Sequence, residues 1–261
     1  MIFTRDTTFE DTVLPEVFYK YRRWSNEQEK RLITHSEIYF SQPFESDIRN
    51  EFNFEIDTTY LSQDRLYDYY IKKTGDEAFA EQQAKTFKLP DNCVENIRKQ
   101  LNERFFIFCV SEKKDNYNLW ETFAELQKGF CVGIDLKRFF TLKQELLGAY
   151  RKVDYYKPHQ IPKFRPYHSN DDERNEDMFN VIFNQPEVYR KEEEHRFSKI
   201  DILKKTSEVP ADCVREIILG SQFPSGDEEN VRSLIGENFP DSKISKAHCD
   251  YDNQYIYFSE I

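Results

Sequence analysis

Residues 189–197, with the sequence YRKEEEHRF, combine three glutamates with two arginines, a lysine and a histidine in one short segment. Side chains of an extended chain alternate between two faces, so Glu192, Glu194 and Arg196 would project from the same face of a strand. Two carboxylates and a guanidinium would then share one small surface. The pattern predicts either a salt-bridged strand or the acidic centre of an active site, and the sequence leaves both interpretations open.

Aromatic residues are expected to supply most of the hydrophobic core. The mean hydropathy of −0.81 resembles that of disordered chains. However, the chain contains 23 Phe and 16 Tyr, and each buried ring removes a large apolar area from water. The length of 261 residues suits one large domain or two small ones, and we expect one.

Charge and segment lengths exclude several classes of protein. The 48 acidic residues outnumber the 37 basic ones, which disfavours non-specific nucleic-acid binding but still allows a local basic groove. No apolar run is long enough to span a bilayer, and residues 1–6 lack the features of a secretory signal. We therefore expect a cytoplasmic protein that does not bind membranes. The five cysteines are widely spaced and are expected to be free thiols.

Hydrophobic periodicity predicts an α+β fold with a mostly antiparallel central sheet and inserted and flanking helices. Strands are expected at 17–22, 37–41, 105–110, 130–135, 150–156, 191–199, 213–219, 244–249 and 255–258. Helices are expected at 27–34, 117–127, 137–147, 177–184 and 226–239, with two or three more in a helical insertion at about 59–104. No Gly- or Ser-rich linker divides the chain, so a single domain over 1–261 is expected.

Two further strands carry candidate site residues. On the first, Lys20 and Arg22 share a face, and cations in a central strand are costly unless they meet anions. Their partner would be Glu192 or Glu194, or the phosphate of a ligand. On the second, Tyr39 and Ser41 share a face, and the hydroxyl group of Ser41 can bond either a ligand amide or a neighbouring carbonyl.

The glutamate pair has two possible roles. In a strand, Glu192 and Glu194 would lie about 7 Å apart, and like charges at that distance raise at least one pKa if they are buried. Such a pair can stabilise an oxocarbenium-like sugar cation. It can equally form a solvated edge, because the basic residues of 190–196 neutralise it locally.

Metal and phosphate motifs are weak. The histidines show no HExxH and the cysteines no CxxC, so no metal site is predicted. The sequence DLK at 135–137 resembles the Asp/Glu-x-Lys of metal-dependent nucleases, a short pattern that is common by chance.

Taken in order, several segments resemble DUF2971, a family defined as a domain of unknown function. The resembling segments are FYKYR at 18–22, IYFSQP at 38–43, CVS at 109–111, LWETFA at 119–124, GFCVGID at 129–135, VDY at 153–155, KEEEHR at 191–196 and VREIILG at 214–220. They cover nearly the whole chain. The tryptophan helix that leads into the Gly-Phe-Cys-Val-Gly strand is the most specific of them.

A second resemblance suggests an activity. A basic residue on a first strand, a hydroxyl residue on a second and Glu-x-Glu on a later one is similar to the arrangement of ADP-ribosyltransferases. This resemblance implies that Lys20 or Arg22 holds NAD, that Ser41 supports the pocket and that Glu194 is catalytic with Glu192 as the auxiliary carboxylate. Tyr39 and Arg196 would also line the NAD site.

The function expected from these resemblances is cleavage of NAD at the nicotinamide–ribose bond, with transfer of ADP-ribose to an unknown acceptor, in a bacterial defence or toxin-type effector. One alternative is a non-catalytic module that binds a nucleotide or a protein on the same scaffold. A metal-dependent nuclease is the third interpretation.

Overall fold

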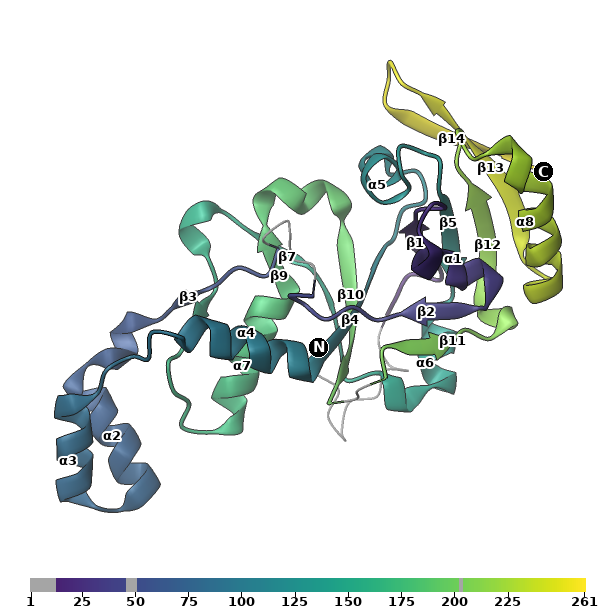
Figure 1. Cartoon of the computed structure of the whole chain (residues 1–261). Coiled ribbons are helices and arrows are strands. Elements are labelled where there is room, and N and C mark those ends of the chain that lie inside the picture. Colours follow the sequence, from purple (N-terminus) through teal and green to yellow (C-terminus); the bar gives the residue numbers. More distant parts are fainter. Residues whose placement is uncertain (1–12, 46–50, 202–203) are drawn as a thin grey trace. The chain divides into compact units, whose positions relative to one another are not determined.

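The computed structural model describes residues 13–45, 51–201 and 204–261 (Figure 1). The strands are β1 (Phe18–Arg22), β2 (Glu37–Tyr39), β3 (Glu55–Ile56), β4 (Phe105–Ser111), β5 (Phe130–Ile134), β6 (Ala149–Lys152), β7 (Asp154–Tyr156), β8 (Lys163–Phe164), β9 (Asn184–Pro186), β10 (Glu194–Ile200), β11 (Thr206–Glu208), β12 (Val214–Leu219), β13 (Lys243–Asp250) and β14 (Tyr255–Glu260). The α-helices are α1 (Glu27–Thr34), α2 (Gln63–Thr74), α3 (Glu77–Thr86), α4 (Cys93–Arg104), α5 (Tyr117–Phe123), α6 (Leu136–Leu142), α7 (Asp171–Phe183) and α8 (Ser225–Asn238).

The described residues form two compact units, one within 1–41, 105–152 and 190–261 and the other within 42–104 and 153–189. The second unit contains the helices α2, α3, α4 and α7 and two short pairs of parallel strands, β3 with β8 and β7 with β9. The helices expected at 59–104 are α2, α3 and α4, whereas the single domain over 1–261 stays a prediction. None of the described helices is long and apolar enough to cross a membrane.

The first unit is built on an eight-stranded sheet with the order β14-β13-β12-β5-β1-β4-β10-β6. All neighbouring pairs are antiparallel except β12 and β13, which are parallel. The predicted α+β class with a mostly antiparallel sheet is therefore confirmed. A separate pair, β2 with β11, belongs to the same unit.

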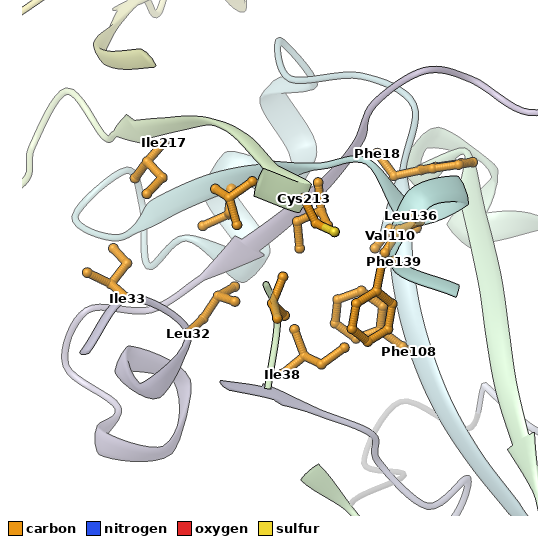
Figure 2. Close-up of a cluster of buried hydrophobic side chains, with 14 of the residues drawn as sticks. Phe18, Leu32, Ile33, Ile38, Phe108, Val110, Leu136, Phe139, Cys213 and Ile217 are labelled. Carbon is orange, nitrogen blue, oxygen red and sulfur yellow. The ribbon is translucent and has the colours of Figure 1, made fainter. Parts of the chain in front are cut away.

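One face of this sheet carries the larger core, in which Phe18, Phe108, Phe130 and Phe197 are fully buried. Figure 2 shows part of this cluster, with side chains from helices α1 and α6 packed among those from the strands. Rings meet mainly edge to face, as between Phe18 and Phe197, whose centroids are 5.3 Å apart. The aromatic composition therefore supplies the buried area that a chain of low mean hydropathy otherwise lacks.

The opposite face is covered by α5 and carries a smaller core around Trp120. The indole ring packs edge to face on Tyr21, with centroids 5.3 Å apart, and its Nε1 donates to the carbonyl of Lys114 at 2.8 Å. The polar atom of this buried ring is thus satisfied, as large amphipathic rings require. The tryptophan helix predicted at 117–127 is confirmed in position but ends at Phe123.

Three consecutive left-handed residues explain the early end of α5. Glu125, Leu126 and Gln127 have φ values of 54°, 53° and 65°, which is uncommon outside glycine. Gln127 is fully buried, and its side chain donates to Glu121 at 2.9 Å and accepts from the hydroxyl of Ser221 at 2.5 Å. These tertiary bonds hold a backbone turn that helical periodicity alone does not predict.

Other predicted boundaries were wrong for comparable local reasons. The strand expected at 191–199 begins only at Glu194, because residues 187–192 form a 3-10 helix and Glu193 has a φ of 47°. The single strand expected at 150–156 is two strands, β6 and β7, that pair with different partners. The helix expected at 177–184 begins earlier, at Asp171, where the side chain of Asn170 caps it.

Close packing at Gly220 gives a first prediction. A Cβ at this position would lie 2.0 Å from the carbonyl oxygen of Gln127, a main-chain atom that cannot move aside cheaply. Gly220→Ala is therefore expected to lower the free energy of unfolding by about 1 to 3 kcal/mol, or more. Gly236→Ala is the control, because a Cβ there meets nothing within 4 Å and alanine favours the helix. Equal denaturation midpoints for the two variants would contradict this packing.

Candidate functional site

The candidate site lies where the pairing of β4 is interrupted on one side. β1 pairs with β4 at Tyr19 and Ser111, and Ser41 forms an isolated bridge with Ile107 through two main-chain bonds of 2.9 and 2.8 Å. In an antiparallel ladder, alternate residues direct their peptide groups to the same side. The peptide group of Cys109 therefore points toward the interval between these two contacts, which we call the pairing break.

Solvent reaches the pairing break. Cys109 is partly exposed, whereas the other residues of β4 are buried. The ammonium group of Lys20 donates to the carbonyl oxygen of Cys109 at 2.5 Å and lies 5.1 Å from the centroid of the Phe108 ring. Lys20 thus supplies the donor that a continuous β1 strand would otherwise supply.

Lys20 is held in an unusual electrostatic state. Burial, with a further contribution from the charge of Arg22, lowers the pKa of Lys20 to about 8, while the carboxylate of Glu194 acts in the opposite direction. Burial also lowers the pKa of Arg22, and the charge of Glu29 opposes this effect. The two cations predicted to share a face do so.

Glu194 and Arg196 form the acidic part of the site. The guanidinium of Arg196 binds both carboxylate oxygens of Glu194, at 2.8 and 3.1 Å, and the two residues are 0% and 6% exposed respectively. Burial alone would raise the pKa of Glu194. The charge of Arg196, together with hydrogen bonds from Arg196 and the Cys109 thiol, outweighs burial and lowers this pKa. Glu194 is therefore an ionised, fixed carboxylate.

The thiol of Cys109 connects the two parts. Cys109 lies opposite Arg196 in the β4–β10 ladder, and its thiol is hydrogen bonded to Glu194. Burial, followed by the charge of Glu194, raises the pKa of this thiol, so it is a weak nucleophile. Its role here is that of a neutral hydrogen-bond donor.

Lys20 and Glu194 approach Cys109 from opposite faces of the sheet. Tyr19 and Glu194 both pair with Ser111, so they share a face, and Lys20 as the neighbour of Tyr19 belongs to the other face. The proposed ion pair of Lys20 with Glu192 or Glu194 is therefore replaced by the bonds to the Cys109 carbonyl and to Arg196. The residues still affect one another electrostatically across the pairing break.

The remaining predicted residues differ in their placement. Ser41 is exposed beside the pairing break, and its Oγ lies 3.4 Å from the carbonyl oxygen of Ile107. Tyr39 lies in β2 and pairs with Thr206 of β11. Glu192 ends the 3-10 helix before β10, so the prediction that it shares a strand face with Glu194 is wrong. The left-handed Glu193, which is ion-paired with Lys113 at 2.6 Å, breaks the alternation.

Sequence reasoning missed a second polar network, on the other face of β10. The Nδ1 of His195 lies 2.8 Å from the hydroxyl of Tyr150, and its Nε2 lies 2.5 Å from a carboxylate oxygen of Glu112, which Lys152 also contacts at 3.3 Å. Burial lowers the pKa of His195 despite the charge of Glu112, and burial raises the pKa of Tyr150 to about 12. Strand alternation separates His195 from Glu194, but nothing in the sequence identified its partners.

The short nuclease-like pattern has a structural role. Asp135 caps helix α6 by accepting from the main-chain N–H of Arg138 at 2.9 Å, and it accepts from Arg215 at 2.7 Å. Among the described residues, no group of three or more His, Cys, Asp or Glu side chains is placed to hold a metal ion. The nuclease interpretation stays a prediction.

Comparisons with known proteins add no relative. No family model matches the chain, and no curated protein or solved structure shows significant similarity to it. The resemblances to DUF2971 and to ADP-ribosyltransferases therefore stay predictions.

The state of Lys20 gives a second prediction. Folded Lys20 loses its proton near pH 8, whereas an unperturbed lysine does so near 10.5, so between these values the unfolded chain binds more protons. The free energy of unfolding contributed by Lys20 must therefore rise with pH across this window. The stability of wild type relative to Lys20→Met is expected to rise by about 3 kcal/mol from the lower to the upper end of the window.

Lysine side-chain NMR titration provides the control. Burial lowers the pKa of Lys199 to about 8 as well, so two lysine signals should titrate near that pH in the wild type. Lys20→Met should remove one of them and leave the other. A variant that keeps both signals would contradict the assignment of the lowered pKa to Lys20.

Proposed function

We propose that this protein cleaves NAD at the nicotinamide–ribose bond, as an ADP-ribosyltransferase-like enzyme, and transfers ADP-ribose to an acceptor. The observation that carries this proposal is that three separate segments meet at the pairing break beside the partly exposed Cys109: Lys20 reaches it from one face of the sheet, Glu194 from the other, and Ser41 lies at its end. An ionised carboxylate can stabilise the sugar cation of this reaction, and the resemblance to ADP-ribosyltransferases implies that the cation and the hydroxyl bind NAD.

The charge of each group suits one part of NAD. Glu194 is ionised, so its carboxylate can stabilise the positive charge that develops on the ribose as the C–N bond breaks and nicotinamide leaves with the electron pair. An acceptor nucleophile then forms the new bond to the same ribose carbon. Arg196 is a positioning residue, because it fixes both oxygens of Glu194.

The cations suit the phosphates. Lys20 and Arg22 lie on one face of β1, and burial lowers the pKa of both groups. A pyrophosphate beside them would compensate this desolvation, because an anion favours the charged form of a buried base. In this proposal, Ser41 supports the nicotinamide side and Tyr39 and Arg196 line the site, while Glu192 has no assigned contact with NAD.

A second candidate function is favoured by one specific observation. Both oxygens of Glu194 are bound by Arg196 in a buried pair, an arrangement that also suits a purely structural ion pair. A non-catalytic module that binds a nucleotide at the same place would need no reactive carboxylate. Saturable NAD binding without turnover would support this function.

The third prediction concerns nicotinamide release from NAD. Glu194→Gln removes the charge with little change in volume and is expected to lower the rate at least 100-fold, as loss of transition-state charge stabilisation does. Glu193→Gln is the matched control, since this neighbouring glutamate is ion-paired with Lys113 at a partly exposed position. Its rate should stay within about twofold of the wild type, because exposed ion pairs contribute little.

Thermal unfolding separates catalysis from architecture. Breaking one side of a buried ion pair costs about 3 to 5 kcal/mol, so Glu194→Gln alone is expected to be destabilised. The double variant Glu194→Gln/Arg196→Met leaves no buried charge unpaired and should recover stability while staying inactive. Release of nicotinamide by the stable double variant at the wild-type rate would contradict a catalytic Glu194.

A further inference from the structure

The eight-stranded sheet has two edges that differ in chemistry. β6 forms one edge with the sequence AYRK, and its Arg151 and Lys152 are the kind of charged residues that keep an edge from pairing. β14 forms the other edge with the sequence YIYFSE, and it contains no lysine, no proline and no break in its register with β13. In the part of the chain that the structure describes, no strand pairs with the outer side of β14.

The outer side of β14 presents main-chain groups for pairing. The N–H of Ile261 donates to the carbonyl of Ile244, so residues two and four positions before Ile261 also direct their peptide groups toward β13. The peptide groups of Ile256, Phe258 and Glu260 consequently point away from the sheet. In Figure 1 these residues belong to the yellow hairpin formed by β13 and β14.

Side chains on β14 are also arranged for a partner strand. Tyr255 and Tyr257 are 58% and 51% exposed, and their rings are stacked with centroids 6.4 Å apart. His248 of β13 stacks on Tyr257 at 5.1 Å. This row of rings is ordered before any partner binds, which lowers the entropic cost of association.

We infer that β14 is an interface through which two copies of this chain associate, by antiparallel pairing of β14 with the β14 of the second copy. A two-fold axis through the strand makes the edge self-complementary and closes the assembly at a dimer. Phe258 then exchanges main-chain bonds with Phe258 of the second copy. Glu260, the one charged residue of β14, then lies opposite Ile256 of the second copy, so no like charges meet.

The size and charge of the interface set its strength. One pair of six-residue strands buries far less than the roughly 1,600 Å² of a standard interface, so the dimer is expected to dissociate in the micromolar range or above. Each chain carries a net charge of −11, so copies repel one another at low ionic strength. Added salt should therefore strengthen the dimer.

Analytical ultracentrifugation over a wide concentration range tests this interface. The wild type is expected to show a monomer–dimer equilibrium, and Tyr257→Lys is expected to weaken it at least tenfold by placing a charge at the edge. Tyr251→Lys is the matched control, because Tyr251 has the same 51% exposure but lies in the turn before β14, and it should dimerise like the wild type. Circular dichroism melts verify that both variants are folded.

Hydrogen exchange provides a test that needs no variant. The outward N–H groups of Ile256, Phe258 and Glu260 should become protected as protein concentration rises, whereas protection in β6 should not change. A strictly monomeric wild type at high concentration and salt would overturn the inference. A dimer that survives Tyr257→Lys, or that leaves these three amides unprotected, would also overturn the inference. Pairing of the β14 edge only with a peptide of different sequence would overturn it as well.

Discussion

Strand β4 cannot satisfy all of its main-chain groups by pairing with one neighbour, and the site follows from this constraint. Tyr19 and Ser41 occupy the two ends of the same side, and the carbonyl of Cys109 lies between them. A peptide group left without a partner in a buried strand costs about as much as a lost hydrogen bond. Lys20 supplies the donor at the expense of its own hydration, which explains its lowered pKa. The same interruption admits solvent to Cys109.

The ion pair of Glu194 and Arg196 bears both on the stability of the fold and on the proposed chemistry. Moving two charges out of water costs about as much free energy as their attraction returns, even with good geometry. Stabilisation of the fold is therefore a weak explanation for this buried ion pair. Apolar residues in place of both charged groups would be equally compatible with a strand such as β10. A fixed, ionised carboxylate beside a solvent-reachable position is, in contrast, what a site needs when a sugar cation forms. A buried, ionised Glu194 therefore fits the proposed cleavage of NAD better than it fits a purely structural role.

Sequence patterns predicted the strands well where local composition decides, as in the aromatic-rich Phe18–Arg22 and the continuous apolar run of Phe105–Ser111. They failed where one backbone angle decides the outcome, since the left-handed Glu193 removes Glu192 from the strand. They also failed where a residue matters through its register. Cys109 has no unusual sequence context, and its role arises because β1 and Ser41 pair on either side of it, which depends on contacts between distant segments.

Ligand binding and protonation of Lys20 are linked, so the pH dependence of ligand affinity shows whether Lys20 belongs to a binding site or serves only the architecture. If Lys20 only satisfies the Cys109 carbonyl, its pKa of about 8 is a cost of folding that no ligand relieves. If a phosphate binds beside it, the charged form is favoured, so the bound protein takes up protons near neutral to mildly basic pH. Affinity for the anion must then fall as the pH rises through about 8, whereas Glu194 stays ionised throughout this range because its pKa is lowered. Lys199 also titrates near pH 8, so such a pH dependence identifies Lys20 only when Lys20→Met removes it. In that case the pairing break is connected directly to binding.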